Sequence, residues 1–205
     1  CSGASLPVRH VVIFARRPGL GQIKRRLAAD IGPVETLRFY RSTLDTVTRR
    51  LLLGQGWSTR LAVTPDDAAF DSRAFPPGVQ CMPQGNGDLG ERMARCLTRF
   101  GPNPAIIIGS DIPGIERRHI AAAFDALRRN DLVFGPSDDG GYWLVGAAQG
   151  ARVGGLFEDV RWSTEHALVD TLENIRPGVR VEILEMLADI DTGATYYARR
   201  QSRWV

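Results

Sequence analysis

Residues Val11–Ala29 read VVIFARRPGLGQIKRRLAA, and this succession predicts the class of fold. Val11–Ala15 is a short apolar run, which is typical of a buried strand. The glycine loop Gly19–Lys24 comes next, and Arg25–Ala29 favours the first turns of a helix. A strand, a glycine loop and a helix in succession are typical of α/β folds, in which free N–H groups at a helix start bind anions.

Lys24, at the end of that loop, is the only lysine among the 26 Lys and Arg residues of the chain. A compact ammonium on a flexible stem suits a phosphate group, whereas arginine presents a planar fork. The sequence therefore predicts that Lys24 binds phosphate, although an Arg-rich codon usage would also leave a single lysine. The loop is not a Walker A motif, because Arg25 stands where that motif has Ser or Thr.

The size and composition predict one domain, residues 1–205, with a full hydrophobic core. A hydrophobic fraction of 43% and a charged fraction of 24% are ordinary for a soluble globular protein. The formal net charge of +3 is mild, and no basic stripe is interleaved with aromatic residues, so no nucleic-acid partner is expected. The oligomeric state is left open.

Cysteine usage and apolar runs bear on the location of the protein. Cys1, Cys81 and Cys96 form no CxxC pair and no metal-ligand spacing, which indicates free thiols in a reducing compartment. No apolar run approaches the roughly 18 residues of a membrane span, and Cys1–Pro7 lacks the apolar segment of a signal peptide. A cytoplasmic protein without a membrane partner is therefore expected.

Short apolar runs bounded by Gly, Pro or Asp predict strands, and apolar residues at helical spacing predict helices. Pro33 suits the first turn of the first long helix, and Asp88 is a natural N-cap for the next. The alternation predicts a three-layer α/β/α sandwich with a mainly parallel sheet. The last two strands before residue 150 are too close for a helical crossover, so one of them is expected to run antiparallel. The strands are expected over Val11–Ala15, Arg60–Thr64, Val79–Met82, Ala105–Gly109, Asp131–Gly135, Tyr142–Gly146 and Val179–Leu184, and the helices over Val34–Leu53, Leu89–Phe100, Glu116–Arg129, Ser163–Ile175 and Ala194–Arg203.

Ligands of open α/β sheets bind at the carboxyl ends of the strands, and further polar clusters of this chain fall at such ends. The glycines of Gln84–Gly90 let a flat ligand approach the backbone closely, or they form a plain turn. In Ile106–Pro113 an apolar strand ends in Asp111. This carboxylate is a hard oxygen ligand that can hold Mg²⁺ or Mn²⁺ against a substrate diphosphate, or it caps the following turn.

Two neighbouring carboxylates, Asp138 and Asp139, stand before a pair of glycines. They either carry chemistry or belong to an Asp-Gly hairpin turn. On extended backbone their side chains point to opposite faces, and we expect Asp139 to face the cleft because Gly140 and Gly141 leave room there for a substrate. Asp139 would bind or deprotonate an acceptor hydroxyl, and Asp138 would be structural. Asp191 is either a second metal ligand from a distant segment or a helix N-cap.

In this order, the clusters resemble a family of glycosyltransferase-like proteins with a GT-A fold, often called the rSAM/selenodomain-associated transferase family. That family is similar to the 2-phospholactate guanylyltransferases and the molybdenum-cofactor guanylyltransferases. The resemblance runs from Val11 to about Tyr197. It is carried by FARRPGLGQIKRRL (Phe14–Leu27), GDLGERM (Gly87–Met93), IIGSDIPG (Ile107–Gly114), GPSDDGGYWLVG (Gly135–Gly146), RWST (Arg161–Thr164) and DIDTG (Asp189–Gly193).

The resemblance implies a nucleotide-diphospho-sugar-binding fold and a role for each cluster. It implies that the loop Arg16–Arg25 faces the nucleotide phosphates, and that Gln84 and Gly87 lie near the base. The residues that it implies for nucleotide binding are Arg16, Gly19, Gly21, Lys24, Arg25, Gln84, Gly87 and Ser110; those for the metal are Asp111 and Asp191; and those around the acceptor are Asp138, Asp139, Tyr142 and Trp162, the two carboxylates being the catalytic candidates.

The function implied by the resemblance is a metal-dependent transfer from a nucleotide sugar onto a small-molecule acceptor, with Mg²⁺ or Mn²⁺ as the cofactor. A nucleotidyl transfer from a nucleoside triphosphate onto a phosphorylated small molecule is the alternative, and a nucleotide-sugar sensor without turnover is a second one. The family usually has Lys in place of Arg16 and Thr in place of Arg25. Its last motif continues Pro-Glu-Asp where this chain has Gly193–Thr195.

Overall fold

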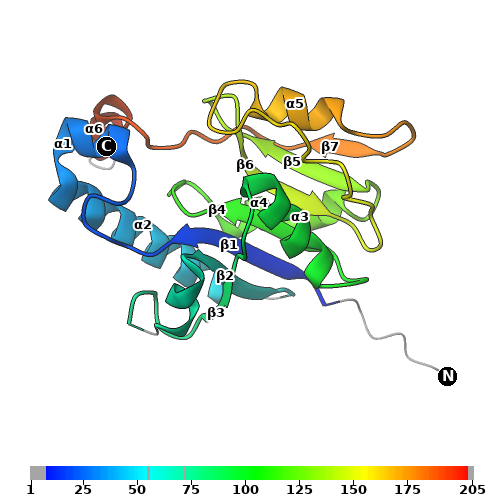
Figure 1. Ribbon diagram of the computed structural model, residues 1–205, viewed down its shortest axis with the longest axis horizontal. Coiled ribbons are helices and arrows are strands. Elements are labelled where there is room, and N and C mark those ends of the chain that lie inside the picture. The colour runs from blue at the N-terminus through cyan, green and yellow to red at the C-terminus, as the bar shows by residue number, and fades with distance from the viewer. Residues whose placement is uncertain (1–7, 55, 72, 203–205) are drawn as a thin grey trace.

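The computed structural model describes residues 8–54, 56–71 and 73–202, in which a seven-stranded sheet lies between two layers of helices (Figure 1). The order in the sheet is β3-β2-β1-β4-β6-β5-β7. Among the described strands, β6 alone runs antiparallel to its neighbours, β4 and β5. The predicted α/β fold with a mainly parallel, mixed sheet is therefore confirmed. The strands are β1 (His10–Arg16), β2 (Ser58–Thr64), β3 (Gln80–Pro83), β4 (Ala105–Gly109), β5 (Leu132–Pro136), β6 (Tyr142–Ala147) and β7 (Val181–Ile183).

Two sequence signals for helix starts are confirmed. Pro33 stands in the first turn of α2. Asp88 caps α3, because its side chain accepts a hydrogen bond of 2.8 Å from Glu91 N while Glu91 Oε2 accepts one of 2.9 Å from Asp88 N. The sequence pattern did not predict the short 3-10 helix η1 (Asp66–Phe70). The α-helices are α1 (Arg25–Ile31), α2 (Pro33–Leu52), α3 (Leu89–Arg99), α4 (Arg117–Ala126), α5 (Ala167–Glu173) and α6 (Gly193–Ser202).

Helix α5 begins later than the predicted Ser163–Ile175, because Thr164 bonds to its own neighbours instead of joining the helix. Its Oγ1 donates to the carbonyl of Arg161 at 2.7 Å and accepts from His166 N at 3.2 Å. Such local hydroxyl bonds compete with helical hydrogen bonding. The predicted ranges for α4 and β7 also extend a few residues beyond the ends of the observed elements.

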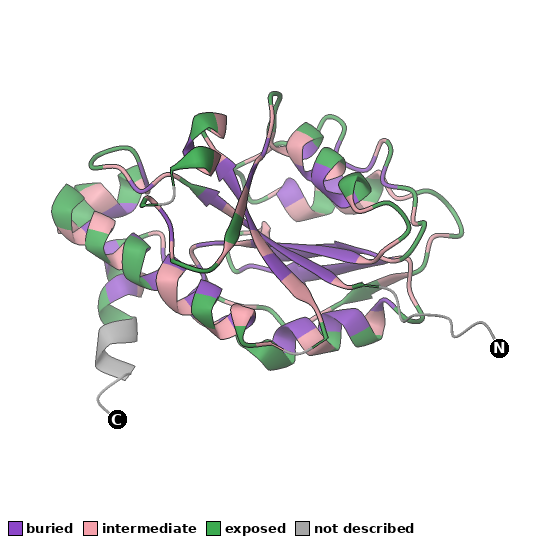
Figure 2. Ribbon diagram, turned by 90° about the horizontal axis from the view of Figure 1, so that it is seen from below, coloured by how far each residue is buried: buried purple, intermediate pink, exposed green. Residues whose placement is uncertain are grey.

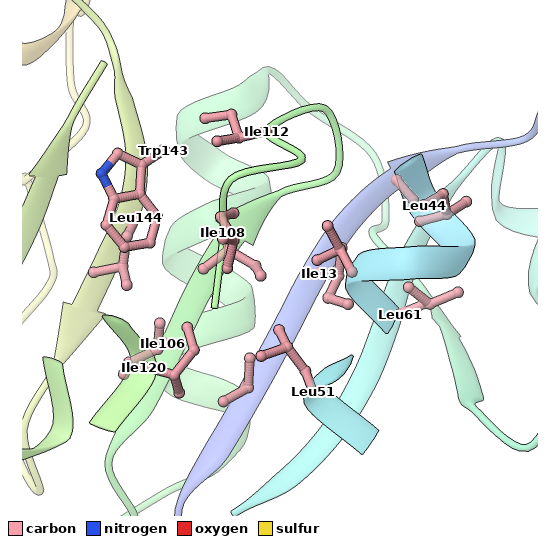
Figure 3. Close-up of a cluster of buried hydrophobic side chains, with 14 of the residues drawn as sticks. Ile13, Leu44, Leu51, Leu61, Ile106, Ile108, Ile112, Ile120, Trp143 and Leu144 are labelled. Carbon is pink, nitrogen blue, oxygen red and sulfur yellow. The ribbon is translucent and has the colours of Figure 1, made fainter. Parts of the chain in front are cut away.

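The core lies on both faces of the sheet, as the alternation of side chains along each strand requires. Ile106 and Ile108 of β4 pack on the side of α2 and α4, whereas Ile107 packs on the side of α3. Ile13 from β1 and Leu44 from α2 belong to the first of these clusters (Figure 3). Figure 2 shows the strands buried between the helices.

The two cysteines that the structure describes, Cys81 and Cys96, are free thiols, and Cys1 lies outside the described residues. Burial raises the pKa of the Cys96 thiol to about 12. This thiol therefore acts as a small packing residue, because only the thiolate is a strong nucleophile or metal ligand.

The direction in which strands are added to the sheet changes between β1 and β4. The chain runs outward from β1 to β2 and β3, and β4 then lies on the other side of β1. Open α/β sheets bind ligands at such a switch point, outside the carboxyl ends of the strands. After β7 the chain passes the end of β5 and crosses to α6, which packs on α1 through Leu27, Ile190 and Tyr196 (Figure 1).

Candidate functional site

Lys24, Asp111 and Asp191 come from three distant segments and meet at the switch point. Lys24 ends the loop after β1, Asp111 follows β4, and Asp191 lies between β7 and α6. Lys24 Nζ lies 3.1 Å from Asp111 Oδ2 and 3.1 Å from Asp191 Oδ1, and it donates a hydrogen bond of 2.7 Å to the carbonyl of Ile190. The structure thus brings the predicted phosphate-binding lysine together with both predicted metal ligands.

The ammonium of Lys24 is nearly shut off from solvent. Its side chain is 7% exposed, whereas those of Asp111 and Asp191 are 36% and 38% exposed. Burial lowers the pKa of Lys24, but the two carboxylates outweigh this effect and raise the pKa above its ordinary value. Lys24 is therefore charged at neutral pH. In this structure its charge is directed to the two carboxylates and not to an open phosphate position.

The backbone at Lys24 turns sharply to make this contact. Its φ is 41°, in the left-handed region that residues other than Gly, Asn and Asp seldom adopt. Lys24 occupies the N-cap position of α1, and no side chain caps that helix. Because α1 is short, its stability depends on packing, and Leu27 supplies this by contact with Ile190 and Tyr196. The same contacts place Asp191 beside the loop.

The two carboxylates suit a divalent metal whose remaining ligands come from outside the protein. The oxygens of Asp111 and Asp191 converge on a position that already holds a positive charge. Among the described residues, no group of three or more His, Cys, Asp or Glu side chains could enclose a metal ion. Oxygen donors favour Mg²⁺ or Mn²⁺, and Mg²⁺ is commonly bound by one or two carboxylates plus substrate phosphates and waters. The residues therefore fit a metal that binds together with a nucleotide.

A cavity of about 310 Å³ adjoins Asp111, and its walls are largely apolar. The walls come from β1, β4, β6, α3 and the loop before α5. Three carboxylates reach it, from Asp111, Asp139 and Asp189. The lining residues are Phe14, Leu89, Met93, Ile107, Ile108, Gly109, Asp111, Ile112, Ser137, Asp139, Gly141, Tyr142, Trp143, Leu144, Val145, Trp162, Ser163, Thr164, Ala167 and Asp189.

Sequence reasoning missed Asp189 as a candidate site residue. Burial raises the pKa of its carboxyl to about 6; Lys24 opposes this shift, and the carboxylates of Asp111, Asp139 and Asp191 add to it. The spacing Asp-Ile-Asp was the available signal. Residues at i and i+2 of an extended segment share a face, and here the intervening Ile190 is buried against α1.

The segment that holds Asp138 and Asp139 is a turn, which is the alternative to extended backbone that the sequence left open. Ser137 N donates to the carbonyl of Gly141 at 3.1 Å, which closes the turn. Asp139 Oδ1 accepts from Gly141 N at 3.0 Å and from Ser137 Oγ at 2.6 Å. Asp138 Oδ1 accepts from the backbone N–H of Asp189 at 3.2 Å. Asp139 lies at the cavity, and Asp138 holds the segment that carries Asp189.

The expectation that Gly140 leaves open space for a substrate is wrong. Gly140 has φ 83°, and a Cβ there would overlap the backbone of Glu165. A hydrogen bond of 3.1 Å from Leu168 N to the carbonyl of Gly140 joins the two segments. At Gly141 a Cβ would meet Asp139 Oδ1 at 3.1 Å. The glycine pair therefore allows close packing of the turn against the loop before α5.

Tyr40, a residue that sequence reasoning missed, positions parts of the predicted nucleotide loop. Its hydroxyl accepts from Arg16 N at 2.9 Å and donates to the carbonyl of Arg16 at 2.9 Å, and it lies 3.3 Å from the buried hydroxyl of Ser110. Tyr40 thereby ties the end of β1 to the residue before Asp111. Arg25 and Gly21 are exposed, and Gly21 has φ 70°, in the left-handed region.

Gln84 and Gly87, predicted to lie near the base, are engaged with the protein itself. Gln84 is buried, its Nε2 donates to the carbonyl of Ala62 at 2.9 Å, and its Oε1 accepts from Arg92 at 2.8 Å. Gly87 is exposed with φ 103°, and a Cβ there would overlap the Glu91 carboxylate that completes the cap of α3. A base could contact this loop through its backbone, whereas the Gln84 amide is already bonded.

The two predicted acceptor aromatics, Tyr142 and Trp162, both line the cavity. Their rings meet edge to face with centroids 6.4 Å apart. Burial raises the pKa of the Tyr142 hydroxyl above its ordinary value, so Tyr142 offers its ring rather than a base. Arg161, the neighbour of Trp162, ties this part of the loop to α5, because its side chain binds Asp170 through hydrogen bonds of 2.9 Å and 2.6 Å. These bonds lower the pKa of Asp170 to about 2.

The fold is similar to those of solved nucleotide-dependent transferases. A protein of Desulfovibrio desulfuricans G20, provisionally assigned as a nucleotide-diphospho-sugar transferase, matches with a TM-score of 0.84 and 23% identity over 96% of this chain and 95% of that one. The 4-diphosphocytidyl-2C-methyl-D-erythritol synthase of Anaerococcus prevotii matches with a TM-score of 0.61 and 11% identity over 96% of each chain. At these identities the likeness shows a shared fold.

The glucosyl-3-phosphoglycerate synthase of Mycobacterium tuberculosis matches with a TM-score of 0.51 and 13% identity. The match covers 89% of this chain and 71% of that one, and that enzyme was solved with Mn²⁺, uridine diphosphate and glucosyl-3-phosphoglycerate.

Residues 46–164, more than half of this chain, match the model of a family described as uncharacterized protein conserved in bacteria, DUF2064. A search of the curated proteins finds no match. The narrower transferase family that the motifs resemble stays a prediction.

In the part of the chain that the structure describes, none of the helices combines the length and the apolar character that crossing a membrane requires.

Proposed function

We propose that this chain, which belongs to the DUF2064 family, is a metal-dependent transferase that uses a nucleotide sugar. One observation carries the proposal: Lys24, Asp111 and Asp191 converge at the switch point of the sheet, with both carboxylate oxygens 3.1 Å from the ammonium nitrogen. Two carboxylates and one cation beside a glycine loop are groups that can bind a metal–diphosphate complex.

Each of these residues has a role in the proposal. Asp111 and Asp191 would hold Mg²⁺ or Mn²⁺, which supplies charge stabilisation to the leaving diphosphate. Lys24 would move from the carboxylates to the phosphates when the nucleotide binds, because a phosphate is the stronger partner for its ammonium once a metal occupies the carboxylates. The exposed Arg16 and Arg25, with Gly19 and Gly21, would complete the phosphate-binding loop.

Asp139 is the proposed base that takes the proton of the acceptor hydroxyl. It lines the cavity, and hydrogen bonds from Ser137 and Gly141 fix its Oδ1. Tyr142 and Trp162 would contact the body of the acceptor. Asp138 would act indirectly. It accepts a hydrogen bond from the backbone of Asp189 and so positions the segment that carries Asp191.

Nucleotidyl transfer is the second candidate function. The fold supports this candidate, because the TM-score to the diphosphocytidyl synthase, 0.61, is higher than the score of 0.51 to the glucosyl synthase. The two reactions break different bonds. Glycosyl transfer releases a nucleoside diphosphate, whereas nucleotidyl transfer from a triphosphate releases pyrophosphate, so the released product distinguishes them.

Nucleotide binding in the presence and absence of metal tests the proposal. Nucleoside triphosphates and nucleotide sugars are titrated by calorimetry, with Mg²⁺, with Mn²⁺ and with EDTA. We expect tighter binding with metal, and a ligand at 100 times its dissociation constant should add about 2.7 kcal/mol of stability. Asp111→Asn should lose the metal dependence. Its control is Asp45→Asn, since Asp45 pairs with Arg49 on the surface of α2. Metal-independent binding in the wild type, or unchanged metal dependence in Asp111→Asn, would contradict the proposal.

A further inference from the structure

The cavity beside Asp111 presents carbon surface to a ligand. Phe14 from β1, Met93 from α3, Tyr142 from β6 and Trp162 from the loop before α5 form much of its wall. The hydroxyl of Tyr142 and the indole nitrogen of Trp162 are buried in the protein, so both residues contribute ring carbons. A volume of about 310 Å³ is at the small end of the range of about 300–1,000 Å³ for ligand pockets. It suits one ring system or a short chain.

The charges that reach this cavity are all negative. Asp111, Asp139 and Asp189 line it, and among its described lining residues there is no Lys, Arg or His. Lys24 pairs with Asp111 but does not line the cavity. A phosphate or carboxylate group placed here would face carboxylates without a cation, and such like-charge contacts exclude a partner.

A bound metal and donor would not reverse this preference. Under the proposed function, the charge of the metal at Asp111 and Asp191 is balanced by those carboxylates and by the donor diphosphate. Asp139 and Asp189 remain directed at whatever fills the cavity. The carboxylate that faces the acceptor thus needs a partner that donates a hydrogen bond, and a hydroxyl group does so.

We infer that this cavity is the acceptor subsite and that it takes an alcohol with an apolar body and no anionic group. The inference rests on the proposed function and favours glycosyl transfer over nucleotidyl transfer onto a phosphorylated molecule. The acceptor oxygen forms a bond to the anomeric carbon of the sugar, while the bond from that carbon to the diphosphate oxygen breaks. The nucleoside diphosphate leaves with the electron pair, and the hydroxyl proton passes to Asp139.

Two probes with the same body test the charge preference: 2-naphthylmethanol and 2-naphthylmethyl phosphate. Each is titrated against the full chain by calorimetry in the presence of Mg²⁺. We expect the alcohol to bind at least about tenfold more tightly than the phosphate, because only the phosphate meets like charges. Asp139→Asn should bring the affinities for the alcohol and the phosphate closer together. In the wild type, NMR contacts from the naphthyl protons should reach the rings of Tyr142 and Trp162.

Variants of Trp162 locate the binding. Trp162→Ala should lose affinity for the alcohol, and Trp162→Phe, which keeps an aromatic wall, should retain most of it. Tighter binding of the phosphate, or NMR contacts to rings outside the cavity, would overturn the inference. If neither probe binds while nucleotides bind with metal, the inference fails and the proposed function stands. If the alcohol binds and no nucleotide does, the proposed function fails and the acceptor assignment fails with it.

Discussion

The ammonium of Lys24 lies 3.1 Å from Oδ1 of Asp191, although 167 positions separate the two residues in the sequence. This contact joins the first loop of the sheet to the last segment before α6. Together with the hydrogen bond from Lys24 to the carbonyl of Ile190, it holds the segment before α6 against the start of α1. The one lysine of the chain therefore has a structural task in addition to the phosphate binding proposed for it.

Replacement of Lys24 by methionine is expected to lower the free energy of unfolding by roughly 1–3 kcal/mol, because it leaves two half-buried carboxylates without their cation. Urea denaturation in EDTA measures this change. The sequence alone predicted phosphate binding for Lys24, and the 7% exposure of its side chain adds an expected role in stability. Arg49→Met is the control, since Arg49 pairs with Asp45 on the surface. Equal losses of unfolding free energy in Lys24→Met and Arg49→Met would contradict a structural role of Lys24.

The neighbours Asp138 and Asp139 are expected to have different functions. Asp138→Ala should weaken Mn²⁺ binding, because it removes the oxygen that accepts from the backbone N–H of Asp189 at 3.2 Å and thereby holds the segment with Asp191. Asp139→Asn should keep metal-dependent nucleotide affinity and lose turnover. Calorimetry with Mn²⁺ and an assay for released diphosphate measure the two effects. If both variants lose metal binding to the same degree and neither affects turnover, the acceptor base lies elsewhere.

The stability of the metal-free protein is expected to depend on Asp189 between about pH 4 and pH 6. The folded pKa of about 6 lies above the ordinary value, so the stabilising contribution of this group is present below the unfolded pKa of about 4. It is lost as the pH rises through the folded pKa. Asp189→Asn should therefore raise the unfolding midpoint at neutral pH in EDTA and have little effect at pH 4. A constant difference between variant and wild type across this range would contradict the shifted pKa.

Gly140→Ala is expected to destabilise the protein more than Gly150→Ala does. Both glycines have positive φ, 83° and 73°, so both variants share a backbone strain of roughly 1–2 kcal/mol. At Gly140 the added Cβ would also overlap the backbone of Glu165, whereas nothing lies within 4 Å at Gly150. Thermal unfolding measures both variants. Equal losses would show that the loop before α5 can move away from the turn.

All seven strands and most of the helices could be predicted from the residues alone, although the 3-10 helix η1 could not. The run Ala105–Gly109 was expected as a strand and is β4, since a short run of β-branched isoleucines bounded by Pro and Gly favours a buried strand. Asp88 could be recognised as a cap because capping depends on residues three positions apart. Periodicity and capping are local, so they can be read without knowing the tertiary structure. Helix α5 was predicted to be longer than it is, because the hydroxyl of Thr164 forms hydrogen bonds with neighbouring residues that compete with helix formation.

The site depended on the tertiary structure. That Asp111 ends a strand followed from the sequence, but its contact with Lys24 did not, because three loops at one sheet edge come together only when the strand order places them there. The raised pKa of Asp189 follows from burial and from carboxylates on other segments. The tight fit of Gly140 against Glu165 depends on a loop that is 25 positions away in the printed sequence. Charges and contacts between distant segments are set by the packing of the whole chain, which local patterns do not contain.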